Sequence, residues 1–467
     1  MVVSMKADKA RLTVGSERSA RHNILIQRLR RSLGAFCSLM VSLVPLDAVA
    51  QITESLLPYP VVPRTPQEQP SAFAPLGVRL GSFFWFPRAE LDGAYNSNIF
   101  ATTTRPTGDL ITALTPSFDL LSNFPRNSLN LHAASLVQVY ADHPAQNTQD
   151  GTISANGTLD VTAGSYLYGT TQVAHQHISY GSPNSPGAIA EPVTYWTYTA
   201  TGGYVQFARR FSYSVDVGVT SAQYNAAQLV GGGVLPQSSQ DGTASSAAVT
   251  GRYEIIPDYL GYVRLGGSLF DYWHTIPGEP RPNFTTHRID VGLQILPTNH
   301  IIYGDAYVGY LVQNFAESSL GSTSTPDFGG DLTWAITPLT TLTFTGLTTF
   351  NTGTPGTIAV GTPGTIVAGA PGAIVPSAGN SYLSRVFSAG VNHQLLPNLQ
   401  LGLTGNYINN TFQGTTRAAD NVFIVDAAVR YQVNRNLYLG GDVYYAKQTG
   451  GFPFSQNIFT LRAGTQF

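Results

Sequence analysis

The feature that most constrains the fold of this chain is a period-two alternation of apolar and polar residues, which recurs from Phe83 to the C-terminus. It is clear in "FSYSVDVGV" (211–219), "LQLGLTGNY" (399–407) and "FIVDAAVRYQV" (423–433). Because successive side chains of a strand point to opposite faces, each segment predicts a strand with one apolar and one polar face. The chain is therefore expected to be all-β.

The connections between these segments are of two kinds. Short turns, such as "NFPRN" (123–127) and "LPN" (396–398), alternate along the chain with longer polar loops. The long loops are expected near residues 97–108, 141–150, 181–192, 225–240, 274–283, 315–324, 352–380, 411–419 and 450–455. Nine loops with two strands each give about 18 strands, and short periplasmic turns with longer extracellular loops are typical of outer-membrane barrels. We predict a transmembrane antiparallel β-barrel of this kind.

A β-propeller is the alternative, because its blades also repeat at about 40 residues. The sequence contains no recurrent blade motif. Composition agrees with a sheet that faces lipid, since charged residues are 11% of the chain, against roughly 25% in soluble proteins. The formal net charge of -2 gives no strongly basic surface, so we expect no nucleic-acid partner.

The N-terminal region has the order of a secretory signal peptide. Basic residues are frequent up to Arg31, "LGAFCSLMVSLVPL" (33–46) is apolar, and the small residues Ala48 and Ala50 follow. We expect residues 1–50 to be a cleaved signal peptide, which would remove the one cysteine of the chain.

The remaining chain is expected to have two parts. Residues 51–82 are rich in proline and lack periodicity, which predicts a short periplasmic segment. The alternation begins at Phe83, so the barrel is expected to cover residues 83–467. No apolar run in this part is long enough for a transmembrane helix.

Motifs of catalysis are missing from the sequence. It contains no G-x-S-x-G, no H-E-x-x-H and no glycine-rich phosphate loop. His175 and His177 would share one face of a strand, but two imidazoles without carboxylate or thiol partners make a weak metal site. We therefore expect no enzyme activity, no cofactor and no bound metal.

The polar face of the strands carries charge. A basic residue on the lipid face would cost roughly 2 to 4 kcal/mol at mid-bilayer, so this face must meet water. Eighteen strands enclose an aqueous channel unless something plugs it. The predicted pore-lining residues are Glu90, Asp92, Asp119, Asp160, Asp216, Arg252, Glu254, Arg264, Arg288, Asp290, Asp305, Asp426, Arg430, Asp442 and Arg462. Acids outnumber arginines, which predicts a lumen that favours cations or neutral solutes.

Tyrosines on the inward face leave two interpretations open. Their rings either stack on sugars in transit or pack against neighbouring side chains of the lumen wall. The tyrosines assigned inward are Tyr262, Tyr303, Tyr307, Tyr438 and Tyr444.

One loop contains an internal repeat. Residues 353–376 read "GTPGTIAV", "GTPGTIVA" and "GAPGAIVP", three consecutive octapeptides. Glycine and proline recur too often for a regular strand. The loop is either a flexible extracellular segment or a constriction folded into the pore.

The last segment, "NIFTLRAGTQF" (457–467), alternates up to its final residue. It is predicted to be the last strand, and it must pair with the strand near residues 88–96 so that the barrel has no open edge. Phe459, Leu461 and Phe467 would face lipid. The terminal aromatic resembles the signal by which barrel-assembly machinery recognises its clients, so we predict that these three residues form an assembly signal and that this machinery is a partner.

Two stretches carry a family resemblance. At "LDGAYNSNIF" (91–100) and at "HISYGSPNSPGAIAEPVTY", which opens residues 177–219, the chain resembles the outer-membrane beta-barrel porin 2 family. The resemblance implies an integral barrel in the outer membrane of a Gram-negative cell, surrounded by lipid. Relatives of this kind are linked to exopolysaccharide secretion, which implies periplasmic polysaccharide-export components as partners.

The function predicted from these observations is a pore in the outer membrane, with the exit of an extracellular polysaccharide as the specific hypothesis. Two alternatives remain. One is a general diffusion porin for small solutes, and the other is a non-conducting barrel that acts as a surface scaffold or adhesin through its long loops.

Overall fold

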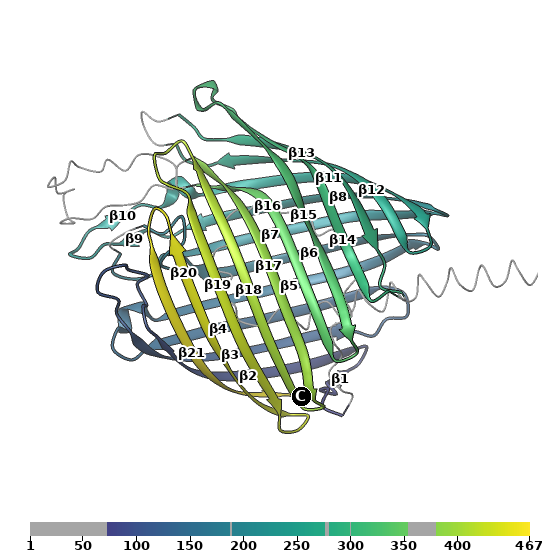
Figure 1. Ribbon diagram of the computed structural model, residues 1–467, viewed down its shortest axis with the longest axis horizontal. Helices are drawn as coiled ribbons and strands as arrows, with labels where there is room; N and C mark the ends of the chain where they lie inside the picture. The colour runs from purple at the N-terminus through teal and green to yellow at the C-terminus, as the bar shows by residue number, and fades with distance from the viewer. Residues whose placement is uncertain (1–71, 187–188, 276–279, 299, 354–379) are drawn as a thin grey trace, which may run out of the picture.

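The protein folds into a barrel of long antiparallel strands (Figure 1). The structure, a computed structural model, describes residues 72–186, 189–275, 280–298, 300–353 and 380–467. The predicted signal peptide, most of the proline-rich segment and the octapeptide repeat lie outside these residues. In the described part of the chain no helix is long and apolar enough to cross a membrane.

The strands follow one another along the chain with only three short 3₁₀ turns between them in the described residues. The strands of the barrel are β2 (Phe83–Asn96), β3 (Asp109–Ser122), β4 (Ser128–Tyr140), β5 (Thr148–Thr162), β6 (Ser165–His177), β7 (Thr194–Ala208), β8 (Phe211–Tyr224), β11 (Gly242–Ile256), β12 (Tyr259–Tyr272), β13 (Phe284–Ile295), β14 (Ile302–Phe315), β15 (Ser322–Thr337), β16 (Thr340–Thr352), β17 (Ser381–Leu396), β18 (Leu399–Gln413), β19 (Asp420–Gln432), β20 (Leu437–Thr449) and β21 (Phe454–Gln466).

Each barrel strand pairs antiparallel with its neighbours in the chain, and the sheet closes on itself between β2 and β21. This seam runs from Arg88↔Gln466 to Asn96↔Ile458. The predicted closed antiparallel barrel is confirmed, with the last strand at the predicted seam. Closure leaves the first and last strands without a free edge in lipid.

Three minor strands lie outside the barrel wall. β1 (Val78–Leu80) pairs with the start of β2, where β21 no longer reaches. β9 (Ala227–Gln228) and β10 (Val234–Leu235) form a small ribbon in the connection between β8 and β11.

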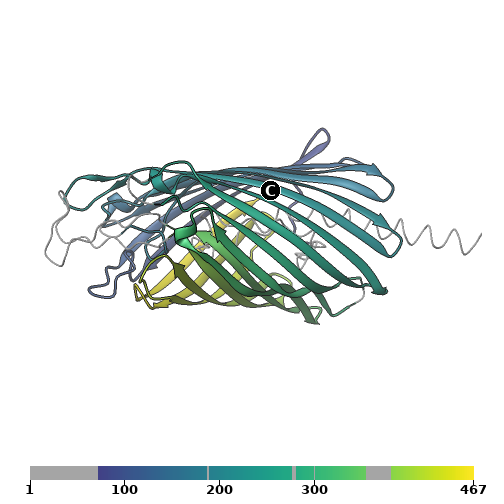
Figure 2. The same ribbon diagram turned by 90° about the horizontal axis from the view of Figure 1, so that it is seen from above.

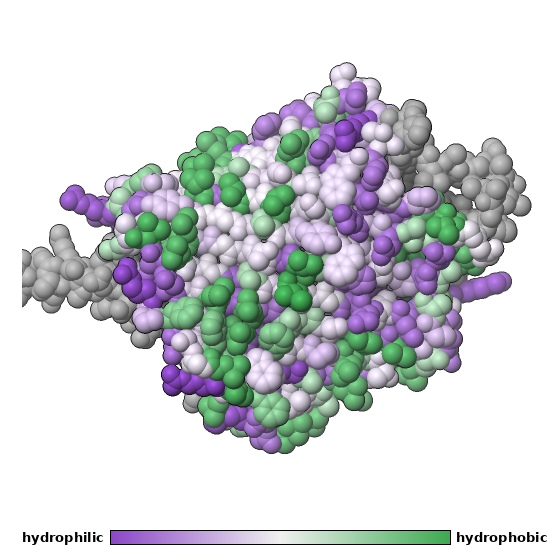
Figure 3. Space-filling view, turned by 180° about the vertical axis from the view of Figure 1, so that it is seen from behind, coloured by the Kyte–Doolittle hydropathy of each residue, from purple (hydrophilic) through white to green (hydrophobic). Residues whose placement is uncertain are grey.

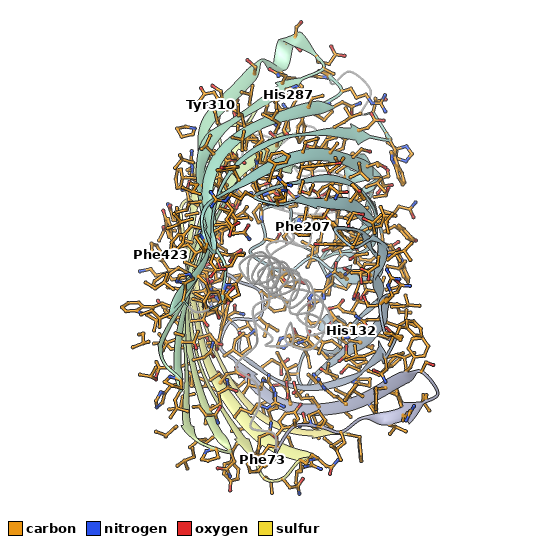
Figure 4. All side chains as sticks on the ribbon, turned by 90° about the vertical axis from the view of Figure 1, so that its right-hand side faces the viewer. Phe73, His132, Phe207, His287, Tyr310 and Phe423 are labelled. Atoms are coloured by element: carbon orange, nitrogen blue, oxygen red, sulfur yellow. The ribbon has the colours of Figure 1, made fainter. Side chains whose placement is uncertain are left out.

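The two kinds of connection fall at opposite ends of the barrel, as the sequence predicts. The turn between β7 and β8 is only residues 209–210, whereas the next connection, between β8 and β11, spans 225–241. We call the end with the long loops the mouth. Figure 2 shows that the barrel is flattened. Figure 4, seen from one end, shows that its outline is oval.

The alternation in the sequence gives the barrel wall an apolar outer face and a polar inner face. Leu461 is 77% exposed and Leu91 is 53% exposed on the outside, while their neighbours Arg462 and Asp92 face the lumen. Figure 3 shows apolar side chains in patches over one side of the outer surface. A lipid environment explains these exposed apolar residues, which water would not favour.

The junction between β15 and β16 is paired over only part of its length. Their pairing begins at Thr337↔Thr340 near the short turn and ends at Gly330↔Gly346, although both strands continue toward the mouth. Gly330 has φ +143°, a conformation that a residue with a Cβ rarely adopts. Beyond this glycine the two strands no longer share a backbone ladder.

Candidate functional site

The predicted pore-lining residues lie on strand faces opposite exposed apolar side chains. Val263 and Leu265 are exposed on either side of Arg264, for example, and Val215 and Val217 flank the buried Asp216. Figure 4 shows the same division, with Phe423 and Tyr310 on the outer side of the ring and His132 within it. The described residues thus place these charges inside, and their role in conduction stays a prediction.

One group of lumen charges gathers at the seam, and we call Glu90, Asp92, Asp442 and Arg462 the seam cluster. Arg462 Nε lies 3.0 Å from Glu90 Oε1 and 3.1 Å from Asp92 Oδ1, and its Nη2 lies 3.4 Å from Asp442 Oδ1. One guanidinium therefore serves three carboxylates from strands β2 and β20. Such a pairing joins the first strand to the last ones across the point of closure.

The seam cluster is extended by an aromatic ring. The Tyr438 hydroxyl donates to Glu90 Oε2 at 2.6 Å, and the guanidinium of Arg430 lies 3.8 Å from the centre of the Tyr438 ring. Arg430 Nη2 also donates to Gln466 Oε1 at 3.2 Å. The carboxylate of Asp426 lies on the next strand at the level of Tyr444.

A second group of charges lies on strands β12 to β15, and we call Arg264, Arg288, Asp290 and Asp327 the wall cluster. Arg264 donates to Asp290 Oδ2 from Nε at 2.8 Å and from Nη2 at 2.6 Å. Arg288 Nε lies 2.8 Å from Asp327 Oδ2. These pairs are nearly buried. They join strands of the wall and also contribute charge to the surface of the lumen.

The remaining predicted residues make local contacts. Tyr262 donates to Asp305 Oδ2 at 3.1 Å, and Arg252 Nη1 donates to Ser214 Oγ at 3.2 Å. Asp119 accepts from His132 at 2.8 Å. Asp160 and Glu254 lie near the short turns, where Asp160 is 3.8 Å from the exposed Arg126.

The inward tyrosines pack against glycines of the neighbouring strand. Tyr262, Tyr307 and Tyr438 are paired in register with Gly292, Gly329 and Gly464. A Cβ added at any of these glycines would come within 2.8 Å of the tyrosine ring, so each ring lies flat on its glycine. The guanidinium of Arg264 lies 4.6 Å from the centre of the Tyr307 ring, and that of Arg430 lies 3.8 Å from the centre of the Tyr438 ring.

This packing favours one of the two interpretations for two of the tyrosines. The rings of Tyr307 and Tyr438 each pack against a glycine and a guanidinium, which favours wall packing over sugar stacking for both. Tyr444 packs in an apolar cluster with Ile408 and Ile424 instead. An aromatic ring that packs over a glycine of the neighbouring strand stabilises a β-sheet.

The most distinctive element inside the barrel is the connection between β6 and β7, residues 178–193, which we call the mouth loop. Ile178 N donates to Val193 O at 2.7 Å and closes its base. Asn184, between two buried prolines, is itself buried. A connection on the outside of a barrel would expose such residues, so the mouth loop lies inside the opening.

Contacts of the mouth loop reach strands and loops all around the rim. Asn184 Nδ2 donates to Thr352 O of β16 at 3.1 Å, and Arg417, between β18 and β19, donates to Pro183 O at 2.9 Å. The ring of Tyr180 meets that of Phe100, between β2 and β3, at 5.4 Å. A segment that touches these separate parts of the ring must cross the mouth.

Further bonds fix the mouth loop at its sides. The Tyr180 hydroxyl donates to Gln146 Oε1 at 2.7 Å, and Gln146 Nε2 donates to Ala190 O at 2.8 Å. Burial raises the pKa of the Tyr180 hydroxyl well above its usual value, so it acts as a neutral donor. Ala190 N donates to Gln228 O at 2.8 Å.

An apolar cluster lies beneath the mouth loop. Ile178, Ile189 and Val193 of the loop belong to the same buried cluster as inward residues of the wall. The wall contributes Tyr195, Ala222, Tyr224, Ala244, Phe270, Phe284 and Leu311, together with Phe350 and Leu383. Apolar side chains in a water-filled lumen are stabilised only when packed together, which holds the loop in place.

Sequence reasoning predicted a long loop near residues 181–192 but not that it folds into the opening, and it placed the candidate constriction in another loop. It considered the octapeptide repeat, which lies outside the described residues. A signal was present, because the segment from Ile178 to Val193 has one charged residue, Glu191, and several apolar ones. An exposed extracellular loop would carry more charge.

The two histidines considered as metal ligands have other partners. His177 Nδ1 lies 2.8 Å from Asp150 Oδ2, and His175 Nδ1 lies 3.0 Å from Gln149 O. Among the described residues, no group of three or more His, Cys, Asp and Glu side chains is placed to hold a metal ion.

The predicted assembly signal is on the outside of the barrel. Phe459, Leu461 and Phe467 are exposed toward lipid, and Phe467 N donates to Pro87 O at 3.2 Å. The terminal residue therefore continues the seam by one more bond. Its recognition by assembly machinery stays a prediction.

The sequence model of a family described as "Putative beta-barrel porin 2" matches residues 69–370 and 373–467. The chain belongs to this family. The match includes the whole barrel and the mouth loop, and it confirms the resemblance at residues 91–100 and 177–219. The protein is accordingly an outer-membrane β-barrel of porin type.

Solved structures with a similar barrel share little sequence with the chain. The outer membrane protein opdK from Pseudomonas aeruginosa is 13% identical, with a TM-score of 0.38, and the match covers 82% of this chain and 99% of that one. OccAB3 of Acinetobacter baumannii is 11% identical, with a TM-score of 0.40 and coverage of 82% and 99%. The copper transporter OprC is 10% identical, with a TM-score of 0.43 and coverage of 84% and 81%. No curated protein matches the sequence.

Proposed function

We propose that the protein is a narrow channel for small hydrophilic solutes in the outer membrane of a Gram-negative cell, restricted at its extracellular end by the mouth loop. The family supports a pore, and the charged lumen supports hydrophilic cargo. The observation that carries the restriction is the set of contacts from the mouth loop to Thr352, Arg417 and Phe100, which belong to distant parts of the rim.

A polysaccharide exit would require a wider opening. A polymer could leave only if the mouth loop moved aside, and the rings of Tyr307 and Tyr438 are packed against glycines and guanidinium groups of the wall. Polysaccharide export, with its periplasmic partners, therefore stays a prediction that rests on the family resemblance. A non-conducting scaffold stays an alternative that conductance can decide.

The test releases the mouth loop from its two distant anchors. In the double variant Asn184→Ala and Arg417→Ala, the bonds to Thr352 and Pro183 are lost. We expect single-channel conductance in planar bilayers to rise several-fold, because the loop no longer spans the opening. Liposome swelling should then admit larger neutral sugars than the wild type does.

Asn225→Ala is the matched control. It removes a rim bond of 2.7 Å to Thr194 that does not cross the mouth, so conductance should stay at the wild-type value. Equal conductance in the double variant and the wild type would refute the restriction. A wild type that passes long sugar polymers would favour polysaccharide exit, and one without conductance would favour the scaffold.

A further inference from the structure

The end of β16 nearest the mouth leaves the ladder of the wall on its β15 side, while the end of β17 stays paired with β18 from Ser381↔Gln413 to Arg385↔Asn409. Pairing between β15 and β16 stops at Gly330↔Gly346, while β16 and β17 stay paired up to Thr352↔Ser381. We call residues 347–352 and 381–385 the inner hairpin. The edge of β16 in the inner hairpin has no backbone pairing with β15.

The inner hairpin lies beneath the wall, inside the lumen. Phe344 of β16 is exposed to lipid, and Phe350 is on the same strand face by alternation, yet Phe350 is fully buried. It belongs to one apolar cluster with Phe270, Phe284 and Leu311, which face inward from β12 to β14. The lipid-side face of the inner hairpin is therefore packed on the lumen-side face of the wall.

Side-chain bonds replace the missing ladder. Gln313 Nε2 of β14 donates to Ser381 Oγ at 3.0 Å, and Arg385 Nη2 donates to Thr325 Oγ1 of β15 at 2.7 Å. Arg288 Nη2 of β13 donates to Thr348 O at 2.9 Å. All three bonds join the inner hairpin to the inward face of β13, β14 or β15.

The same residues also fit a second arrangement, in which β16 pairs with β15 over its full length. If the register of Gly330↔Gly346 continued, Pro326 would stand opposite Phe350 and Ser324 opposite Thr352. Phe350 would then face lipid beside the exposed Phe328, as the alternation of a barrel strand requires. Pro326 would leave one ladder bond unmade, which keeps the two arrangements closer in energy.

We propose that the inner hairpin is a gate with two packings, one tucked under β12 to β15 and one paired with β15 in the wall. The hinge lies at the pair Gly330↔Gly346, because pairing with β15 ends there and Gly346 is the last residue of β16 that keeps its place in the wall. Two discrete packings of one segment form a switch that a solute or a partner can bias.

The gate acts on the mouth through the mouth loop. Asn184 of that loop is bonded to Thr352, the last residue of the inner hairpin on β16. When the inner hairpin moves into the wall, Thr352 leaves the lumen, the bond breaks and the apolar cluster that holds the mouth loop loses Phe350 and Leu383. This coupling rests on the proposed function, since it describes what opens the channel.

Two engineered disulfides test the gate, in a chain whose one natural cysteine, Cys37, is replaced by serine. Gln313→Cys with Ser381→Cys joins residues that touch in the tucked packing. Ser324→Cys with Thr352→Cys joins residues that would stand opposite each other in the paired packing, if the register of Gly330↔Gly346 continued. Ser246→Cys with Ser268→Cys, paired in register between β11 and β12, is the control.

After mild oxidation in proteoliposomes, we expect both gate pairs to cross-link in part of the population, as seen by gel mobility with and without reductant. The Gln313/Ser381 disulfide should keep conductance at or below the wild-type level. The Ser324/Thr352 disulfide should raise it several-fold, reversibly with reductant, and the control disulfide should leave it unchanged.

The cross-links test whether the inner hairpin has two packings, and the conductance tests whether its movement opens the channel. If Ser324 and Thr352 never cross-link while the other pairs do, the second packing does not exist and the proposal fails. If they cross-link without a change in conductance, the segment moves but is no gate, and the proposal also fails. If no variant conducts at all, the proposed channel function fails, while the gel still shows whether the segment moves.

Discussion

Two junctions of the barrel wall differ in character: the seam between β2 and β21, where the barrel closes, and the junction between β15 and β16. At the seam, ladder pairs run from Arg88 to Asn96, and the seam cluster joins the same strands inside the lumen. At the other junction the ladder stops at Gly330, and side chains hold what remains. The seam is built to stay closed, and the second junction is built to allow two packings.

The difference shows where a membrane barrel can omit ladder bonds. An unpaired strand edge in hydrocarbon leaves backbone groups without partners, at a cost of several kcal/mol for each group. At the β15–β16 junction, protein covers the gap, because the inner hairpin lies behind it and Thr348 Oγ1 donates to Phe328 O at 3.3 Å. Tests that weaken the seam should therefore act on assembly, and tests at the hinge should act on stability and gating.

The largest effect is expected from removal of Phe467. Its backbone N–H makes the last bond of the seam, to Pro87 O, and its ring is exposed where we propose that assembly machinery binds. Deletion should lower the amount of folded barrel in the outer membrane several-fold and leave export to the periplasm unchanged. Heat-modifiable mobility of membrane fractions on a denaturing gel measures the folded amount.

Phe467→Tyr is the conservative control and should assemble normally. Phe452→Ala removes a partly exposed aromatic from the loop between β20 and β21, far from the short turns, and should also assemble. Normal outer-membrane levels of the deletion variant would show that the terminal aromatic is not an assembly signal.

A smaller effect is expected at the hinge of the second junction. Gly330→Ala would place a Cβ 2.2 Å from the carbonyl oxygen of Asp305 and would force alanine into φ +143°. Backbone strain and overpacking together should lower the free energy of unfolding by roughly 2 to 5 kcal/mol. Urea titration of the barrel in detergent, followed by tryptophan fluorescence, measures the change.

Gly405→Ala is the matched control, because a Cβ at this strand glycine meets no atom within 4 Å. Its stability should stay within about 0.5 kcal/mol of the wild type, as for other unhindered surface changes. Equal loss in both variants would mean that any strand glycine is sensitive and that Gly330 has no special place at the junction.

Much of the fold could be predicted from the sequence because a barrel in lipid follows local rules. The alternation around Leu91 and Leu461 assigns faces residue by residue, and loop length assigns the two ends. The break between β15 and β16 could not be predicted from the same pattern. Phe350 alternates like a lipid-facing residue, and only the tertiary fold shows that a second layer of protein covers it.

Less of the candidate site than of the fold could be predicted from the sequence. Alternation assigns Asp290 and Arg462 to the lumen, but it says nothing of their partners, since Arg264 and Asp92 lie on other strands. The mouth loop depends on contacts such as that of Asn184 with Thr352, which are far apart in the chain. Such contacts depend on how a loop folds into the opening, which no local pattern encodes.

The smallest effect is expected in the seam cluster, where Arg462→Gln would leave Glu90, Asp92 and Asp442 without their common cation. Uncompensated charge in a partly buried site is destabilising, and solvent screening moderates it because Arg462 keeps 18% of its side chain exposed. We expect the free energy of unfolding to fall by about 1 to 2 kcal/mol. Urea titration in detergent measures it.

A second substitution separates charge from packing in the seam cluster. Asp92→Asn in the Arg462→Gln background removes one of the repelling carboxylates, so part of the lost stability should return, whereas Asp92→Asn alone should be destabilising. Arg126→Gln is the control for a surface pair, since Arg126 is 66% exposed and 3.8 Å from Asp160, and it should change little. Purely additive effects of the two seam substitutions would mean that the cluster contributes packing only, and the ladder of β2 and β21 alone would then hold the seam.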